Sequence, residues 1–223
     1  MARTAEADTK TLILDAAELA FAEQGFDASL RHIIAAAGVN LAAVHYHFGS
    51  KEALISAVFA RRLGPLNKER LRLLDAAEAS SNNGLLGVDV VLESLVGPAL
   101  KLAQEPATRG LLRLFGRSIA EPNEAVQRII SEQFGNVVRR FTMAFRHALP
   151  ELPEAVLLWR IQFVIGAMGH VMCDPQRIKE ISAGLCDPRD TSTVLKEMVT
   201  FLAVGMRAPV RSPHDSKMDF RPG

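Results

Sequence analysis

Residues 29–54 read SLRHIIAAAGVNLAAVHYHFGSKEAL, and this stretch decides the fold. A glycine ends each of its first two runs of alanine and aliphatic residues. The stretch therefore predicts short helices at 30–37 and 41–47 and the start of a longer helix at residue 51. Each predicted helix is preceded by a residue of the kind that caps helix N-termini: Ser29, Asn40 and Ser50.

Two short helices joined by a tight turn form a helix-turn-helix, a motif that places its second helix in the major groove of DNA. The two helices must cross closely, and Gly38 supplies a turn conformation that other residues resist. One side of the motif would form a small core around Ile33 and Val44. The other side of the second helix would then face DNA, with these residues exposed: Asn40, Leu41, Ala42, Ala43, His45, Tyr46 and His47.

The rest of the chain also indicates helices, because apolar residues recur at helical spacing and strand signals are weak. We expect a first helix at 8–24 and a long helix from residue 51 towards 79, broken or kinked at Gly64–Pro65. A polar joint follows at 80–84. Further helices are expected near 85–104, 108–121, 123–149, 154–173 and 192–206, with a less ordered segment at 174–189 and a disordered tail at 207–223.

Composition is that of an ordinary globular protein, with 48% hydrophobic and 23% charged residues. The start of the chain lacks a secretion signal, and no uninterrupted apolar run reaches the roughly 18 to 20 residues that span a bilayer. We therefore expect a cytoplasmic protein that does not use a membrane. Cys173 and Cys186 lie far apart without neighbouring ligands, so no metal site and no cofactor are expected.

Net charge is +1 and does not by itself argue for nucleic acid. The local distribution is more informative. Residues 28–51 contain no Asp or Glu but contain Arg31, Lys51 and three histidines. A carboxylate facing the phosphate backbone is unfavourable, so this absence favours a DNA-binding face. Composition alone leaves a second interpretation equally open, in which the stretch is acid-free by chance within an alanine-rich bundle.

The stretch 29–54 resembles the DNA-binding signature of the TetR family of bacterial regulators. The resemblance includes the Ala-Gly-Val turn at 37–39, the His-Phe pair at 47–48 and the Ser-Lys-Glu-x-Leu start of the fourth helix at 50–54. It implies an all-α homodimer that places two recognition helices in successive major grooves of double-stranded operator DNA. Residues 1–50 would form the helix-turn-helix DNA-binding domain. A long helix would join it to a helical ligand-binding and dimerisation domain at 51–206.

The resemblance also assigns roles to single residues. Ser29 matches the cap where hydroxyl and backbone amide meet a phosphate, and Arg31 matches a position that reaches base edges. Leu41 and Ala42 match base-facing positions, where apolar side chains sense thymine methyl groups. The remaining positions of the DNA-binding set are Asn40, Tyr46, His47 and Lys51, the last three resembling backbone contacts, with a structural role for His47 equally open.

Three positions depart from the family pattern. His45 stands where the family usually has Tyr, so it contacts either a phosphate or a base. Ala42 replaces a frequent Gly, and Ile34 replaces a usual Ala and would spread the two helices slightly. These departures affect individual contacts rather than the domain.

The helix expected at 154–173 is unusually apolar, which predicts burial on several sides, and the helix at 192–206 has a broad apolar face. The resemblance implies that they build a four-helix dimer interface, whereas the apolar pattern alone also fits a core within one chain. The residues expected in the interface are Trp159, Phe163, Gly166, Met198, Phe201 and Leu202.

A ligand pocket is expected among aromatic and methionine side chains beside a few cationic ones, although each such residue taken singly is more often core or surface. As a group they suit an elongated apolar ligand with an anionic end. The set comprises Phe115, Arg117, Phe134, Phe141, Phe145, Trp159, Phe163 and His170, with Met168 and Met172 adding apolar surface.

The stretches 39–55, 60–65, 158–163 and 201–207 are similar to a TetR subgroup that represses fatty-acid degradation genes. This similarity implies a long-chain fatty acid or its acyl-coenzyme A as the effector. The sequence therefore predicts a repressor that a small apolar or amphipathic ligand releases from DNA. A helical dimeric adaptor without DNA binding is the alternative. No phosphate loop, nucleophile elbow or metal-binding helix motif points to an enzyme.

Overall fold

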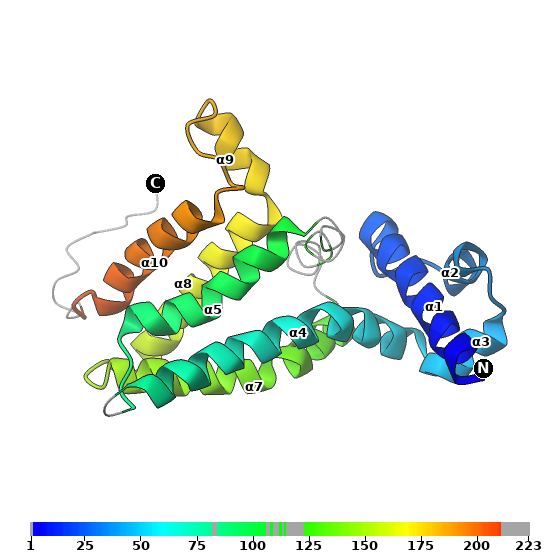
Figure 1. The fold of residues 1–223 in the computed structure, drawn as a ribbon, viewed down its shortest axis with the longest axis horizontal. Helices are drawn as coiled ribbons and strands as arrows, with labels where there is room; N and C mark the ends of the chain where they lie inside the picture. Colours follow the sequence, from blue (N-terminus) through cyan, green and yellow to red (C-terminus); the bar gives the residue numbers. More distant parts are fainter. Residues whose placement is uncertain are drawn as a thin grey trace, which may run out of the picture.

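The computed structural model describes residues 2–81, 84–105, 108, 112, 114 and 123–210, with side chains from residue 8 onward. Every regular element in these ranges is a helix. Figure 1 shows a small helical group at one end, a long helix leading out of it, and a larger bundle at the other end. The helices are α1 (Ala2–Gln24), α2 (Leu30–Ala37), α3 (Leu41–Phe48), α4 (Lys51–Ser80), α5 (Val88–Gln104), α7 (Glu124–Ala148), α8 (Glu154–Cys173), α9 (Pro175–Ile181) and α10 (Thr191–Arg207).

The small group packs α1 against α2, α3 and the first half of α4. Its centre is apolar, with Ile13 and Phe21 from α1 and Phe59 from α4 all fully buried. Three ion pairs join the edges of α1 and α4. Arg61 Nη1 lies 2.6 Å from Asp15 Oδ1 and 4.0 Å from Glu18 Oε2, and Arg62 Nε lies 3.1 Å from Glu18 Oε1.

Helix α4 continues through Gly64 and Pro65 for 30 residues, so of the break or kink expected at this dipeptide the break does not occur, and the kink stays a prediction. Proline removes one helical hydrogen bond and strains the preceding turn. Leu63 and Leu66 on either side of it are buried against neighbouring helices, and burying one such side chain contributes about 1.5–3 kcal/mol. Tertiary packing therefore offsets the local cost and keeps the helix continuous.

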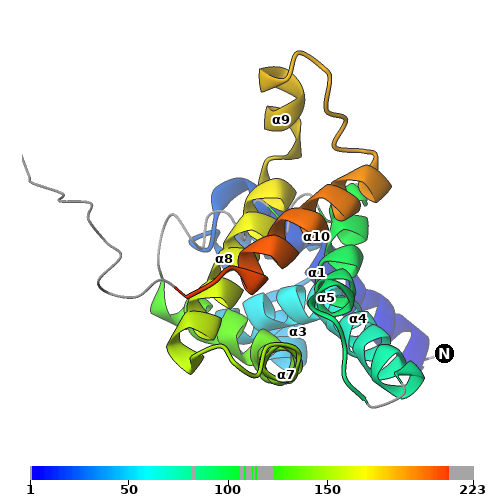
Figure 2. The ribbon, with the colours of Figure 1, turned by 90° about the vertical axis from the view of Figure 1, so that its left-hand side faces the viewer.

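The larger bundle is built around α5, which contacts α4, α7, α8 and α10. Figure 2 shows α5 enclosed by these four helices. The apolar sequence of α5 requires this position, because a helix that is apolar nearly all round must be covered on several sides. Val91, Leu92, Val96 and Ala99 are completely buried.

Some helix limits differ from those expected from the sequence. Helix α1 begins at Ala2 rather than near residue 8, and α5 begins at Val88 rather than near 85. The segment at 174–189 contains the short helix α9, for which Pro175 stands in the first turn, where proline fits a helix best. Most of the helix expected at 108–121, and residues 211–223 of the expected tail, lie outside the described residues. The domain limits given above stay a prediction.

Candidate nucleic-acid interface and ligand cavity

The starts of α2 and α3 are fixed by local hydrogen bonds. Ser29 Oγ accepts from the backbone N–H of His32 at 3.2 Å, and Asn40 Oδ1 accepts from that of Ala43 at 2.8 Å. Gly38 ends α2 with φ of 66°, in the left-handed region that favours glycine. The sequence signals used to locate these helices are thus the interactions that begin and end them.

Burial separates the two sides of the motif. Ile33 is 0% exposed and Val44 is 2% exposed, so these two side chains hold α2 and α3 to the small core. Seven of the nine residues assigned to DNA contact are exposed and two are half-buried. The exposed ones are Ser29, Arg31, Asn40, Leu41, Ala42, His45 and Tyr46, and the half-buried ones are His47 and Lys51. Their contact with DNA stays a prediction.

His45 is tied to its own helix end. Its Nδ1 lies 2.9 Å from the carbonyl oxygen of Gly49, the residue that ends α3. The carbonyl can only accept, so Nδ1 donates and Nε2 is the ring nitrogen left for another partner. Neighbouring rings pack at the same end of α3. The rings of Tyr46 and His47 meet edge to face with centroids 5.1 Å apart, and Lys10 Nζ lies 5.9 Å from the ring centroid of Phe48.

Two acidic side chains of α1 are held by arginines of α4, whereas Asp27, directly before the acid-free stretch, is exposed. Asp15 and Glu18 pair with the arginines of α4, as described above. Glu52 follows the acid-free stretch at the start of α4. Its pKa is lowered because the carboxylate accepts hydrogen bonds from its own backbone N–H and from the Ser50 hydroxyl. The carboxylate thereby stabilises the positive end of α4.

The aromatic residues assigned to a ligand pocket do not form one cluster. On α7, Phe141 and Phe145 are buried in the core and Phe134 is half-buried. On α8, Trp159 and Phe163 point outward and are 64% and 63% exposed. The spacing of apolar residues predicted the helices, but it did not predict which face of each helix turns towards the core. Phe115 and Arg117 lie outside the described residues.

The expected dimer surface is mostly exposed in the single chain. Trp159 and Phe163 stack with centroids 6.0 Å apart, and Phe201 on α10 is 76% exposed. Gly166 and Met198 are half-buried. Leu202 is 6% exposed, so its place in the interface has to be corrected, since its side chain packs within its own bundle.

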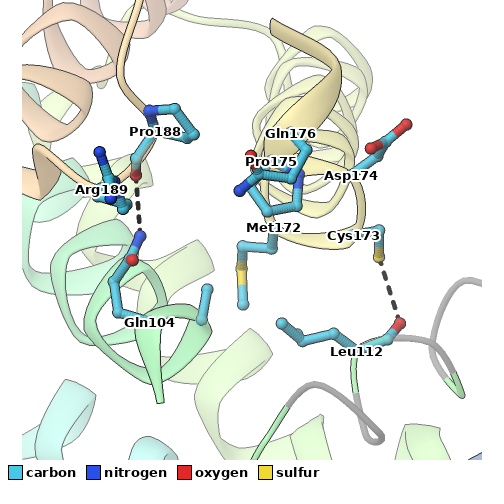
Figure 3. Close-up of a pocket in the computed structure, with 10 residues that line it drawn as sticks. Gln104, Leu112, Met172, Cys173, Asp174, Pro175, Gln176, Pro188 and Arg189 are labelled. Carbon is cyan, nitrogen blue, oxygen red and sulfur yellow. Dashed lines mark hydrogen bonds between the residues drawn. The ribbon is translucent and has the colours of Figure 1, made fainter. Parts of the chain in front are cut away.

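A cavity of about 650 Å³ lies between α5, α8 and the segment leading to α10 (Figure 3). Gln104 Nε2 donates to the carbonyl of Pro188 at 2.9 Å across one side of it. Met172 from α8 lines it, whereas the six assigned ligand residues that the structure describes do not. Sequence reasoning missed most of this lining, because much of it comes from the segment that was expected to be less ordered.

A second hollow, of about 610 Å³, lies between α8, α9 and α10. His170, which is exposed, lines it together with three residues of the expected dimer surface, Met198, Phe201 and Leu202. His170 therefore belongs with the outer face of α8 and α10 rather than with the phenylalanines of α7.

Arg70 was missed by sequence reasoning. It projects from α4 into the core and is 2% exposed. Burial lowers the pKa of its guanidinium to about 10, so the group stays charged at neutral pH. The detectable signal was spacing, because Arg70 shares an apolar stripe with three leucines at intervals of three and four residues: Leu63, Leu66 and Leu74.

Comparison with protein families gives two matches. Residues 13–58 match the family described as "Bacterial regulatory proteins, tetR family", and residues 93–205 match "Tetracyclin repressor-like, C-terminal domain". No curated protein matches the chain.

Solved structures with the same fold are distant in sequence. The fatty acid degradation regulator FadR from Bacillus halodurans has a TM-score of 0.62 at 20% identity, over 89% of this chain and 96% of that one. SmeT, the repressor of the Stenotrophomonas maltophilia multidrug efflux pump SmeDEF, has a TM-score of 0.57 at 21% identity, over 87% and 91%. SmeT in complex with triclosan gives a TM-score of 0.60 at 22% identity, over 86% and 90%.

Proposed function

The chain belongs to the TetR family of bacterial regulatory proteins, and on that premise we propose that it is a homodimeric repressor released from its operator by an amphipathic ligand. The family consists of DNA-binding transcriptional regulators and not of enzymes. Membership implies operator DNA, a second copy of the chain and a small-molecule effector as partners. Its members are typically cytoplasmic, and we infer the same location here, because the operator lies there.

The observation that carries the DNA-binding part is the exposed face of α2 and α3. This face contains no acidic residue from Ala28 to Lys51. It also presents the N-termini of two helices, capped by Ser29 and Asn40, whose partial positive charge favours phosphate. Together these features support binding to the DNA backbone, with Arg31 reading base edges.

Homodimerisation is supported by the outer face of α8 and α10. Trp159, Phe163 and Phe201 expose large aromatic surface there, and such surface on a soluble protein marks an interaction site. By length and composition alone α8 could also cross a bilayer, with a mean hydropathy of 1.5. One such helix is weak evidence for a membrane span, and we propose that its apolar face packs on the same helices of a second copy.

For the effector we propose a long-chain fatty acid or its coenzyme A ester. The C-terminal stretches similar to the fatty-acid subgroup support this class, as does the shared fold with FadR. SmeT, which has the same fold, holds triclosan, an apolar molecule with one polar end. The cavity beside Met172 has the volume of a site for a ligand of this kind.

The proposal is tested by fluorescence anisotropy on DNA from upstream of the chain's own gene, against scrambled DNA, over a series of salt concentrations. We expect tight and sequence-dependent binding that weakens steeply with salt. Arg31→Ala should lower affinity for the upstream DNA by about 1–3 kcal/mol and affinity for scrambled DNA by less. Arg72→Ala, a change at an exposed arginine on α4, is the matched control.

Oleate and oleoyl-coenzyme A are then added to the complex. Release of the DNA by either compound supports the proposed effector class. A preference of about 3 kcal/mol for the released conformation weakens the DNA complex more than 100-fold. Absence of DNA affinity at every salt concentration would favour the adaptor alternative and contradict the proposal.

A further inference from the structure

We propose that Arg70 is the anchor for a carboxylate, so that the effector enters the bundle with its anionic end first and as a free acid. This inference rests on the proposed function for the existence of an effector. It names the Arg70 guanidinium as the group that binds the effector, and a carboxylate as the group of the effector that is bound.

The first argument is the lack of a counter-charge. Arg70 forms none of the ion pairs found among the described residues. Its partners are neutral: Nε donates to the carbonyl of Leu95 at 2.8 Å, and Nη1 lies 3.4 Å from Oδ1 of Asn67. A buried charge is costly unless it is paired. An anion that binds beside Arg70 would therefore form an especially favourable interaction.

The other arginines that face this bundle differ from Arg70. Arg140 on α7 has two carboxylate partners, with Nη2 lying 2.6 Å from Asp75 and 3.0 Å from Glu78. Arg160 on α8 donates to the carbonyl of Met206 at 2.7 Å, at the C-terminal end of α10. Both therefore have structural partners at the edge of the bundle, and among the arginines that the structure describes Arg70 is the buried one.

A structural role explains one of the donors of Arg70 but not all of them. Pro98 in α5 has no N–H and disturbs the helix around it, and the Leu95 carbonyl in the preceding turn accepts from Arg70 Nε. Nη2 is different, because its partner is the sulfur of Met168 at 3.4 Å. A thioether is a weak acceptor for a charged donor, and a carboxylate oxygen in its place would form a charge-assisted hydrogen bond.

The second argument is the position of Met168 relative to the cavity. Met168 and Met172 lie four residues apart on one face of α8, which corresponds to about 6 Å along the helix. Met172 lines the cavity of about 650 Å³ in Figure 3, and Met168 contacts Arg70. The two flexible side chains are thus placed in series between the cavity and the guanidinium. Rotation of Met168 away from Arg70 would let a carboxylate reach it.

This arrangement selects between the two effectors proposed above. A free fatty acid can place its carboxylate on Arg70 and its chain along the methionines towards the cavity. A coenzyme A ester has no carboxylate at that end of the chain, and its large polar part cannot follow into a core that is closed around Arg70. The inference therefore favours the free acid.

The test measures direct binding by isothermal titration calorimetry to the full chain without DNA. The probes are straight-chain carboxylates from butanoate to oleate, their methyl esters, and oleoyl-coenzyme A. We expect at least one acid to bind about 10- to 100-fold more tightly than its ester, the size expected for hydrogen bonds to a charged group. Arg70→Gln should abolish this difference and Arg70→Lys should keep part of it. The matched control, Arg72→Gln, removes an exposed arginine from the same helix and should behave as wild type.

Several results would overturn the inference. These are equal binding of acid and ester to the wild-type chain, binding of no carboxylate of any length, or an undiminished preference in Arg70→Gln. Arg70→Gln could fail to fold, because it removes a donor to the Leu95 carbonyl. In that case the inference is tested by comparing acid with ester on the wild-type chain and on Arg70→Lys. DNA binding by the unliganded chain is measured separately. Loss of that binding would contradict the proposed function, while the preference for acid over ester would still stand or fall by itself.

Discussion

The imidazole of His45 and the carbonyl of Gly49 are joined by a hydrogen bond of 2.9 Å, within the helix expected to enter the DNA groove. The last carbonyl groups of a helix have no partner within it. The bond satisfies one carbonyl of the turn that leads from α3 to α4. It also leaves only Nε2 of this ring for DNA, so His45 shapes the recognition element first and contacts DNA at most through one nitrogen.

Replacing His45 with alanine should therefore weaken DNA binding without changing its salt dependence. We expect affinity to fall several-fold, because the end of α3 loses its side-chain donor. The slope of log affinity against log salt should stay constant, since no phosphate contact is removed. Lys51→Ala provides the comparison, and its slope should decrease by about one. A similar decrease in His45→Ala would mean that the ring contacts a phosphate.

Gly38→Ala should destabilise the chain through backbone conformation alone. A Cβ added at Gly38 meets no atom within 4 Å, but φ of 66° strains a residue with a side chain. The expected cost is about 1 kcal/mol, measured as a lower midpoint of thermal unfolding. Gly135→Ala in α7 is the matched control, because its Cβ also meets nothing. There, alanine should stabilise the helix, and equal effects at both sites would contradict the argument.

Phe163→Glu should convert a dimer into a monomer. Phe163 is 63% exposed and stacks on Trp159, so in the proposed dimer both lie at a desolvated centre where a carboxylate has no partner. Sedimentation velocity at micromolar concentration measures the change. Leu19→Glu alters an equally exposed apolar residue on α1 and should leave the mass unchanged. A dimeric Phe163→Glu chain would place the interface elsewhere.

Asp190 should make the start of α10 sensitive to acid. Its carboxylate accepts from the hydroxyl groups of Ser192 and Thr193 and from the Thr193 backbone N–H, and these bonds lower its pKa to about 2 from 3.8. A lowered pKa in the folded state contributes stability above pH 4, which is lost as the pH falls towards 2.

Asp190→Ala should accordingly lower the thermal unfolding midpoint by a few degrees at pH 7, because the helix loses its cap. At pH 2 the difference from wild type should be clearly smaller, since about half of the wild-type carboxyl groups are then protonated. Asp174→Ala, at a helix start with no side-chain cap bond, is the control. A constant difference between Asp190→Ala and wild type from pH 7 to pH 2 would contradict the assignment.

Local signals predicted the helix-turn-helix well. Ser29, Asn40 and Ser50 were identified as caps from the sequence, and each accepts the expected backbone hydrogen bond. Caps act within three residues, so no distant contact can displace them. The end of α2 followed for the same reason, since Gly38 ends that helix locally.

Tertiary effects were less predictable. The break expected at Pro65 is overridden by leucines that pack on other helices, and those contacts are not local in sequence. Trp159 and Phe145 have similar apolar character, but one faces outward and the other is buried. Arg70 was overlooked because arginine is normally a surface residue. Its burial depends on α5 and α8, which the pattern of α4 alone does not contain.

The unbroken α4 has a mechanical consequence. At 1.5 Å per residue its 30 residues span about 45 Å, and Arg70 lies about 28 Å from Lys51. A rod of this kind works as a lever arm: a tilt of about 5° around Arg70 displaces Lys51, and the recognition element beside it, by about 2–3 Å. In a dimer each protomer would contribute one such displacement, and the distance between the two recognition helices would change. That distance must stay at about 34 Å to match two half-sites on DNA. If Arg70 binds a carboxylate as proposed above, a group of that size beside the pivot would be enough to disturb the fit to the operator.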